Sequence, residues 1–533
     1  MKFLRVLSVV ALVALLAATG AYAETQNVKV SGDLAVRGIF RDNYTLASQV
    51  EAPGNNTILP GTIVGTAAGA FPGTGTFTPT SVTADGSVPV AGSMGAVNRS
   101  NQSYFMSTTE VQIDADLTDN VSTCIRLLNQ RDWNVTDSSS GYTSTSQVST
   151  MGSGGFGHST AYAQGAYNSY DEFGVDLELA YVTLKSFLYS PLTVTIGRQN
   201  LWFGKGFIVG ANARQNLNQP LSAPEYTALN AFDSVKAVLD FDPWTISAIY
   251  SRIWQNDIQA DDGIDLWGAN VGYKFDSYKG EAEGYWFYKQ DNQVRAFNWG
   301  NKGTGNQVST IGLRGSMDPI DVVTVYAEIA GQFGNYVGNQ LQGNNRSRVA
   351  GALDVGADCR YFTDKWAWKP KFGMEFIWYS GQEQSTATDG SGQYHGWDPM
   401  FRGKTDSLIR EWIGRYYFSA KYGFQANNYY NSVDNSFQNQ GQMIFKGSLQ
   451  PMDSIKLTGN LNMFWNQYSY NPSTMKDLGY VGTEIDLGAT WDYTEDVSFN
   501  VVTGFFVPGQ VYYNDQGTAS TAVDMVGSVK VSF

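Results

Sequence analysis

Segments in which apolar and polar side chains alternate residue by residue recur along this chain, and they restrict its fold more than any other feature. In residues 481–493, Ile485 and Leu487 share one parity, while Glu484 and Asp486 share the other. Successive side chains of a β-strand point to opposite faces, so each such segment predicts a strand with one apolar and one polar face. The pattern returns in three further segments: 321–333, 349–361 and 455–465.

The N-terminus has the features of a secretory signal peptide. Two basic residues precede an apolar run at 6–18, and small residues lead up to Ala23. The run is shorter than the roughly 20 residues that a membrane-spanning helix needs. We therefore expect cleavage after Ala23, which makes 1–23 the signal peptide and 24–533 a single mature domain.

A closed β-barrel allows strands with one charged face to span a membrane. Beyond the signal peptide the chain has no run of about 18 apolar residues, so helices are not expected to span a bilayer. Strands that close on themselves satisfy their backbone hydrogen bonds, turn apolar residues toward lipid and turn polar residues toward an internal lumen. The sequence therefore predicts an all-β fold, a transmembrane antiparallel β-barrel.

The C-terminus agrees with this prediction. Met525, Val529 and Val531 alternate with polar residues, and the last residue is Phe533. This ending resembles the C-terminal signal that the outer-membrane assembly machinery recognises. It implies a multi-pass barrel in the outer membrane of a Gram-negative bacterium, with lipid, lipopolysaccharide and the assembly machinery as partners.

The number of strands tests the barrel, because both termini of a bacterial barrel normally lie in the periplasm and the number must then be even. A first count gives an odd number. Placing 414–425 in an extracellular loop restores parity at about 18 strands, and the last strand, 523–533, then closes against the first, 27–40. A barrel of that size predicts an aqueous lumen rather than a core of packed side chains.

Short polar turns alternate with long connections, as periplasmic turns and extracellular loops do in such barrels. The short turns often contain proline, as at Asp318-Pro319 and at 450–453. The long loops are expected at about 42–102, 132–172, 203–231 and 380–439. The first of these either folds into the lumen as a constriction or extends freely, and the sequence favours neither.

The composition suits many strands with aromatic girdles. Aromatic residues make up 14% of the chain, and only 16% of its residues are charged. We interpret aromatic residues near strand ends, Trp202 among them, as anchors at the lipid headgroups. The net charge of −14 argues against nucleic acid as a partner. Cys124 and Cys359 fall on opposite strand faces, which favours free thiols over a disulfide.

Several short sequence motifs resemble those of the alginate-export family of outer-membrane porins. They are Gly197-Arg198-Gln199, Phe203-Gly204, Phe232-Asp233-Ser234-Val235-Lys236, and Trp397-Asp398-Pro399-Met400-Phe401-Arg402-Gly403 followed by Asp406. The resemblance spans roughly 190–465 and implies a monomeric barrel of about 18 strands. It also implies that the last of these motifs lies in a long loop ahead of the final strands.

Charges of both signs occupy the predicted inner face. The candidates for lining the pore are Arg198, Lys236, Arg314, Arg360, Glu178, Glu281, Glu283 and Glu328. They either form opposed rows across the lumen or pair with neighbours on adjacent strands, and the second interpretation is favoured. Because rings of one sign of charge set ion preference, this mixture does not support the export of a polyanion.

Signals for metal binding or catalysis are weak. Asp261, Asp262 and Asp265 offer oxygen ligands for Ca²⁺, but a solvated acidic loop is favoured because the full spacing of a calcium loop is absent. No cofactor motif occurs, and His158 and His395 are the only histidines. Since the Gly-x-Ser-x-Gly elbow is also missing, we expect neither a cofactor nor an enzyme.

The sequence thus predicts a porin-like channel through which small hydrophilic solutes or saccharides diffuse. Two alternatives stay open: export of an alginate-like polysaccharide, and a barrel that forms a sheath around a periplasmic protein. A hydrolase at the barrel rim, which would depend on His395, is a weaker third alternative. A monomer is favoured over a trimer.

Overall fold

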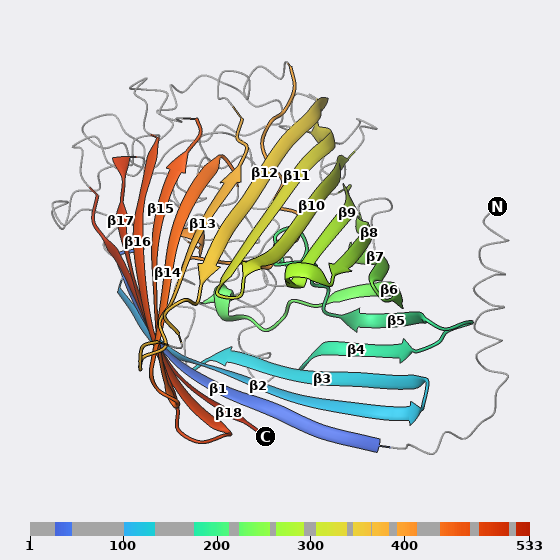
Figure 1. The fold of residues 1–533 in the computed structure, drawn as a ribbon, viewed down its shortest axis with the longest axis horizontal. Coiled ribbons are helices and arrows are strands. Elements are labelled where there is room, and N and C mark those ends of the chain that lie inside the picture. The colour runs from blue at the N-terminus through green and yellow to red at the C-terminus, as the bar shows by residue number, and fades with distance from the viewer. Residues whose placement is uncertain are drawn as a thin grey trace, which may run out of the picture.

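Eighteen antiparallel strands form one closed barrel in the computed structural model (Figure 1). The residues described are 27–44, 101–133, 175–212, 223–255, 263–292, 305–337, 345–363, 365–382, 392–412, 438–468, 479–510 and 519–533. Each strand pairs with its neighbours along the chain, and β1 pairs with both β2 and β18. The sheet therefore has no free edge, which confirms the predicted fold class.

The strands have the following bounds: β1 Asn27–Asp42, β2 Asn101–Thr118, β3 Val121–Asp132, β4 Asp176–Leu184, β5 Leu192–Gln199, β6 Phe232–Phe241, β7 Trp244–Trp254, β8 Ile264–Phe275, β9 Gly280–Asp291, β10 Asn306–Ile320, β11 Val323–Val337, β12 Asn345–Cys359, β13 Lys371–Tyr379, β14 Gln440–Met452, β15 Ile455–Asn466, β16 Tyr480–Asp492, β17 Val497–Pro508 and β18 Ala522–Ser532. Three short helices lie between strands: η1 Pro224–Tyr226, η2 Ser277–Lys279 and α7 Arg410–Trp412. Within the described part of the chain, no helix is long and apolar enough to cross a bilayer.

The first and last strands close the barrel, as predicted. Their register runs from Asp33 opposite Ser532 to Asp42 opposite Val523. Beyond this ladder, the backbone amide of Gly32 donates to the carbonyl of Phe533 at 2.8 Å, and the amide of Phe533 donates back at 2.9 Å. The terminal residue is thus part of the seam, with its ring on the outward face.

Two segments predicted as turns belong to the ends of strands in the structure. Asp318 and Pro319 belong to β10, and Gln450 and Pro451 belong to β14. In both strands the register shifts at this point, between Met317 and Ile320 and again between 449 and 452. Proline has no amide hydrogen to give to the ladder, and a bulge at a strand end is one of the few places where a sheet accepts it.

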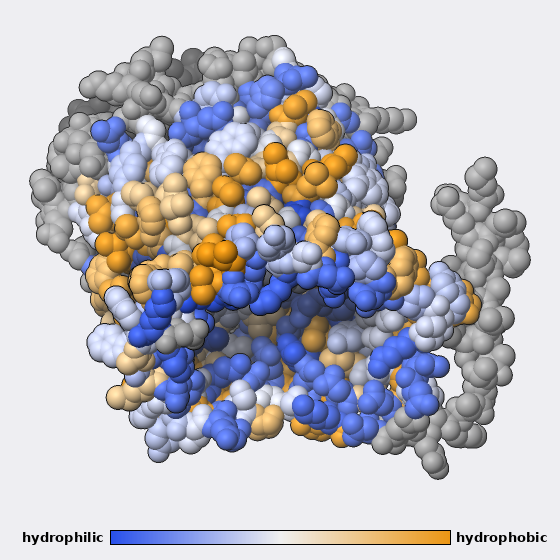
Figure 2. Space-filling view, in the orientation of Figure 1, coloured by the Kyte–Doolittle hydropathy of each residue, from blue (hydrophilic) through white to orange (hydrophobic). Residues whose placement is uncertain are grey.

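The outward face of the barrel is apolar. Large hydrophobic side chains that alternate along the strands are exposed there, including Ile311, Leu313, Ile329, Phe333, Phe372, Met374 and Leu487. Figure 2 shows hydrophobic residues gathered across the wall formed by β10–β17. A belt of this kind on a closed barrel is what contact with lipid requires.

The cysteines lie on opposite faces, as the alternation predicts. Cys124 is buried on the inner face of β3, while Cys359 ends β12 on the parity of outward Val355, and both are free thiols. The segment 414–425 and the loop region 45–100 lie outside the described residues, so the two interpretations of the loop at 42–102 stay open.

The lumen is not uniformly aqueous, contrary to the prediction from strand number. Inward side chains of β6–β14 form one apolar cluster with residues of two connecting segments, 201–212 and 392–412. These segments, expected as parts of extracellular loops, pack inside the barrel instead. We call them the lumen segments. They occupy part of the lumen in the half of the barrel next to the long connections, and toward the short turns the inner face stays open as the hollow with hydrophilic borders in Figure 2.

Candidate functional site in the barrel lumen

The two lumen segments bind each other through their backbones. Val209 and Phe401 form a parallel bridge, in which the amide of Phe401 donates to Ile208 at 3.0 Å and the amide of Gly210 donates to Phe401 at 2.8 Å. Further along, the amide of Gly403 donates to Gly206 at 2.9 Å. The buried backbone groups of these segments thereby form hydrogen bonds, although the segments are not strands of the barrel.

Glycines permit this close approach. A Cβ atom on Gly403 would lie 2.6 Å from the backbone carbon of Gly210, and one on Gly210 would lie 2.9 Å from the Cα of Gly403. The ring of Trp202 covers the contact, and its indole nitrogen donates to the carbonyl of Gly204 at 3.0 Å. Trp202 therefore packs on the lumen segments, and its assignment to an aromatic girdle is wrong.

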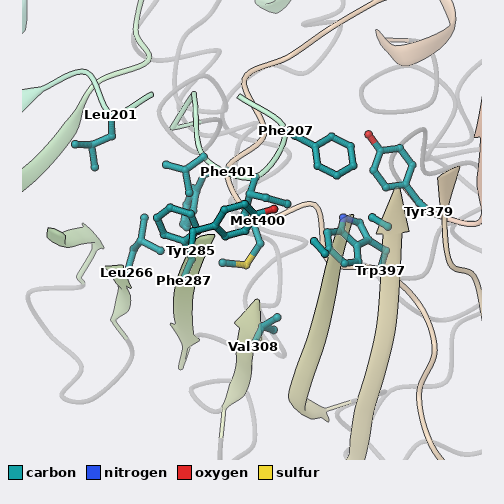
Figure 3. Packing of buried hydrophobic residues seen from close by; sticks show 14 of the residues in the cluster. Leu201, Phe207, Leu266, Tyr285, Phe287, Val308, Tyr379, Trp397, Met400 and Phe401 are labelled. Atoms are coloured by element: carbon teal, nitrogen blue, oxygen red, sulfur yellow. The ribbon is translucent and has the colours of Figure 1, made fainter. Parts of the chain in front are cut away.

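Apolar side chains seat the lumen segments against the wall. Figure 3 shows Phe401 and Met400 among Tyr285, Phe287 and Leu266 of the neighbouring strands. On the other side, Phe207 stacks on Tyr379 of β13 at a centroid distance of 5.6 Å, and Trp397 lies next to the same tyrosine (Figure 3). Burial of aromatic side chains on this scale contributes strongly to the position of both segments.

Asp398 is the polar anchor of the second lumen segment. Its carboxylate pairs with Lys289 of β9, and Arg348 of β12 lies 4.0 Å away. The side chain of Gln332 on β11 binds its backbone on both sides, at 2.8 Å to the amide and 2.7 Å to the carbonyl. Burial raises the pKa of Asp398, but Lys289 and Arg348 outweigh it and hold the pKa below its ordinary value.

An aromatic and basic stack holds the start of the same segment. The rings of Tyr394 and Tyr336 are parallel with centroids 3.6 Å apart, and the guanidinium groups of Arg346 and Arg348 lie 5.2 and 4.9 Å from the centroid of Tyr394. Cations over aromatic faces are stabilising when desolvated. Nδ1 of His395 lies 2.9 Å from the carbonyl of Val349, so the backbone occupies this ring nitrogen.

Lys404 lies at the centre of a buried charge network. Its ammonium group pairs with Asp354 of β12 at 2.8 Å, with Glu375 of β13, and with Asp406 at 3.3 Å. Lys446 of β14 shares two of these carboxylates, at 2.5 Å from Glu375 and 3.0 Å from Asp406. Breaking such a buried pair leaves an uncompensated charge, which costs about 3–5 kcal/mol. The network therefore ties the segment to three adjacent strands.

A single strand carboxylate positions the end of the second segment. Glu484 on β16 accepts the backbone amides of Leu408, Ile409 and Arg410 at 2.7, 2.8 and 2.7 Å. It also accepts the hydroxyl of Ser407 at 3.1 Å. Successive amides that converge on one anion form an anion-binding nest at the start of α7.

A further part of the connection between β5 and β6, residues 223–231, also lies inside the barrel, next to β1 and β3. Arg41 of β1 pairs with Glu225 in η1, and Gln130 of β3 donates to the hydroxyl of Thr227 at 2.8 Å. Burial raises the pKa of Glu225 to about 7, against the opposing effect of Arg41. The lumen is thus narrowed by parts of two predicted extracellular loops, 203–231 and 380–439.

Most predicted pore-lining residues lie on the inner face and pair with lateral neighbours. Arg314 binds Glu283 directly across the ladder and Glu281 at 2.5 Å, both on β9. Arg360 pairs with Asp318 at 3.2 Å near the short turns. These pairs follow the interpretation favoured from the sequence, in which charges of opposite sign meet on adjacent strands.

Two inward glutamates follow a similar arrangement. Glu178 lies 3.5 Å from Arg126 on the adjacent β3. Glu328 accepts the hydroxyl of Tyr285 at 2.7 Å, and this tyrosine passes over Gly312 of the intervening strand to reach it. Neither carboxylate extends freely into the lumen.

Arg198 is on the outward face, so its assignment to the pore is wrong. It shares parity with exposed Ile196 and lies opposite Asp233, 3.4 Å away, which has the parity of exposed Val235. Lys236 has the opposite parity and faces the lumen, opposite Thr195. A charged pair near the strand ends on the outward face is at the depth where lipid headgroups accept charge.

The predicted calcium loop is only partly described. Asp261 and Asp262 lie outside the described residues. Asp265 is in β8, where it pairs with Arg252 at 2.5 Å and accepts the hydroxyl of Tyr250 at 3.0 Å. Among the residues with known positions, no group of three or more potential ligands could hold a metal ion.

The lumen segments were missed by alternation because they are not strands. A signal was available in the sequence, since Trp397, Met400 and Phe401 are bulky apolar residues in a stretch otherwise suited to a solvated loop. Such residues favour a buried position. These residues lie in the motif that resembles the alginate-export family, but the motif alone does not predict a position inside the barrel.

A closed antiparallel barrel with an apolar belt outside and a charged, partly open interior defines the class of outer-membrane β-barrel channels. The chain belongs to the alginate export family, whose model matches residues 90–525. This match confirms the resemblance noted in the sequence and extends it over more of the chain. No curated protein matches the sequence.

Several solved structures share the barrel architecture at low similarity. Pseudomonas aeruginosa OpdQ and Acinetobacter baumannii OccAB1 are each 9% identical to this chain, with a TM-score of 0.48 and coverage of 96% of this chain and 99% of theirs. Pseudomonas aeruginosa OccK2 (OpdF), solved in complex with glucuronate, is 10% identical with a TM-score of 0.45 over 96% and 99%. Likeness at this level carries no argument about the solute.

Proposed function

We propose that small hydrophilic solutes diffuse through this barrel, and that the lumen segments set the narrowest part of the path. The carrying observation is the contrast between the two halves of the inner face. Near the short turns, inward Lys274 and Lys456 are exposed, whereas near the long connections inward Gln332 and Asn462 are fully buried. Solutes thus meet a wide polar vestibule first and a narrow region after it, or the reverse.

Passage by diffusion needs no covalent step, and we propose none. The inward carboxylates beside the lumen segments have structural partners: Glu375 binds two lysines, and Glu484 binds three backbone amides. A general base must be within reach of a substrate proton. Groups committed in this way act as anchors of the segments, which supports a channel rather than a rim enzyme.

Transport of a long polyanion is a weaker candidate. The family is described by alginate export, which favours it. Against it, charges of both signs occupy the narrowed half and pair with each other, as Lys404 does with Asp354 and Glu375, so no row of unpaired basic side chains lines a path for a polyanion there in the described residues. A sheath around a periplasmic protein is also disfavoured, because the chain itself occupies part of that half of the lumen.

We further propose lipid, lipopolysaccharide and the assembly machinery as partners of a monomeric barrel. Supporting features are the apolar belt, the outward pairs Arg198–Asp233 and Arg252–Asp265 near the long connections, and the outward ring of Phe533 at the seam. Charged groups at this level suit headgroup contact.

Single-channel recording in planar bilayers tests the proposed channel. The wild-type protein should give stepwise conductance. Asp398→Asn should increase it, because Lys289 and Arg348 lose their counter-charge and the second lumen segment loosens. Asp453→Asn, in the exposed turn between β14 and β15, is the matched control and should leave conductance unchanged. Absence of conductance from the wild type and from a variant without residues 45–100 would overturn the proposal.

A further inference from the structure

A hollow of about 270 Å³, lined by polar side chains and by apolar Leu179 and Val238, lies against the inner face of β4, β5 and β6. Tyr181 and Thr183 line it from β4, Thr195 from β5 and Lys236 from β6, and Asn200 lines it just beyond the end of β5. We call it the Lys236 pocket. Its volume is near the lower end of the range for small-molecule sites, about 300 Å³.

A glycine interrupts the inward side chains of β5 next to this pocket. Gly197 takes the inward position between Thr195 and Gln199, opposite Tyr181 in the ladder. Its φ of +129° lies in the region that favours glycine, and a Cβ at this position would overlap the backbone of Ala180 on β4. The row of inward side chains on β5 is therefore interrupted beside Lys236.

Lys236 differs from Arg314 and Lys404, two other cations near the lumen segments, in its lack of an acidic partner in the described part of the chain. Its cross-strand neighbours are Thr195 and Ile249, neither of which is acidic. Among the residues that the structure describes, no carboxylate forms an ion pair with it, whereas Arg314 and Lys404 each bind at least two. Its nearest aromatic partner is Phe203 of the first lumen segment, with the ammonium 5.5 Å from the ring centroid.

We propose that the Lys236 pocket is a binding subsite for a small hydroxylated carboxylate on its path through the barrel. The proposal rests on the proposed channel function and names a solute class for it. One ammonium group balances one carboxylate, and a charge-assisted hydrogen bond between them is stronger than a neutral one. The hydroxyl oxygens of Thr183 and Thr195, 3.4 Å apart, can both donate to and accept from solute hydroxyl groups.

The chemistry of the pocket favours a single negative charge. A dianion or a polyanion would bring more charge than the one lysine offsets, and a neutral polyol would leave the ammonium without a counter-ion. The position also fits a transit site, because Lys236 lies midway along β6, where the open half of the lumen meets the ring of Phe203.

Isothermal titration calorimetry on the folded, detergent-solubilised protein tests binding at this site without relying on transport. Gluconate is the probe, and sorbitol, its neutral polyol counterpart, is the reference ligand. Gluconate should bind to the wild type and sorbitol at least tenfold more weakly, because an ionic hydrogen bond is lost. Lys236→Gln should weaken gluconate binding at least tenfold, and Lys236→Arg should retain it.

Lys456→Gln is the matched control, since it removes an equally inward but exposed charge from β15, away from the pocket. It should bind gluconate as the wild type does. The site is ruled out if the folded wild type binds no gluconate, or if Lys236→Gln binds it unchanged. Bilayer conductance of the same preparations separates the two proposals, because an intact channel that binds no gluconate overturns only the site.

Discussion

Gly210 and Gly403 allow the backbones of the two lumen segments to lie in contact, and a methyl group added to either glycine should push the segments apart. Gly403→Ala places a Cβ 2.6 Å from the backbone of Gly210. Overpacking of this kind costs about 1–3 kcal/mol. We expect the folded protein to become more sensitive to protease within residues 392–412, measured by limited proteolysis and mass spectrometry.

Gly527→Ala is the control for this substitution. Gly527 lies on β18 with open space around it, so a Cβ there meets no atom within 4 Å. Equal protease sensitivity of the two alanine variants would contradict the role assigned to the glycine contact.

Glu411 makes the seating of α7 dependent on pH. Burial raises its pKa to about 7, against the opposing effect of Arg402. Because the folded value exceeds the ordinary value of about 4.3, the folded state holds the proton more tightly. Its stabilising contribution is therefore complete at low pH and is lost as pH rises through about 7.

Hydrogen exchange at residues 405–412 measures this effect. After correction for the intrinsic rate, protection should fall between pH 5 and pH 8 in the wild type. Glu411→Gln should flatten that dependence, while Glu495→Gln, in the exposed turn after β16, should retain it. A wild-type profile that is flat, or that rises with pH, would refute the assignment.

Arg198 illustrates how far residue type alone can predict a site. Its charge suggested the lumen, but the alternation through Val194 and Ile196 places it outward, and Asp233 opposite it has the same parity. Parity was the better guide, because side-chain direction in a strand is geometric, while a charge near the membrane surface is tolerated on either face.

At the scale of elements, one strand residue should control one loop. Glu484→Ala removes the acceptor from three backbone amides, two of them buried, and each buried unsatisfied group costs about 1–3 kcal/mol. We expect α7 and its flanking residues to leave β16, with hydrogen-exchange protection lost at 407–411 while the wall remains folded.

Glu484→Gln keeps one carbonyl acceptor and should lose less protection than Glu484→Ala. The reverse order, or uniform loss of protection along β16 and β17, would show that Glu484 supports the wall rather than the loop.

Strands were predictable to a degree that loops were not. Alternation placed Glu484 on the inner face of β16, since the apolar residues of 481–493 share the other parity. It carried no information about Leu408 and Ile409, whose amides meet that carboxylate from 76 and 75 residues away. Periodicity reports local side-chain direction, whereas the path of a connection depends on which buried groups need partners.

For the whole molecule, the apolar belt should determine insertion into lipid. Leu313→Arg places a charge at an exposed outward position on β10, and arginine on the lipid face of a barrel costs about 2–4 kcal/mol near the bilayer centre. Urea titration of the protein folded into vesicles should show this loss.

Thr458→Arg is the matched control, because Thr458 is an exposed inward position on β15. It should change stability much less than Leu313→Arg. Similar losses for both variants would place Leu313 away from lipid.

The contact between the lumen segments has a mechanical meaning for the molecule. Val209 and Phe401 are joined directly, although the strands β6–β13 lie between them along the chain. A barrel of this circumference with an empty lumen would become elliptical in cross-section under pressure from one side. The second lumen segment is anchored by Asp398 to β9, by Lys404 to β12 and by Glu484 to β16, and these anchors fix the spacing of that stretch of the wall. Lateral pressure from the bilayer should therefore deform this stretch less than the rest of the barrel.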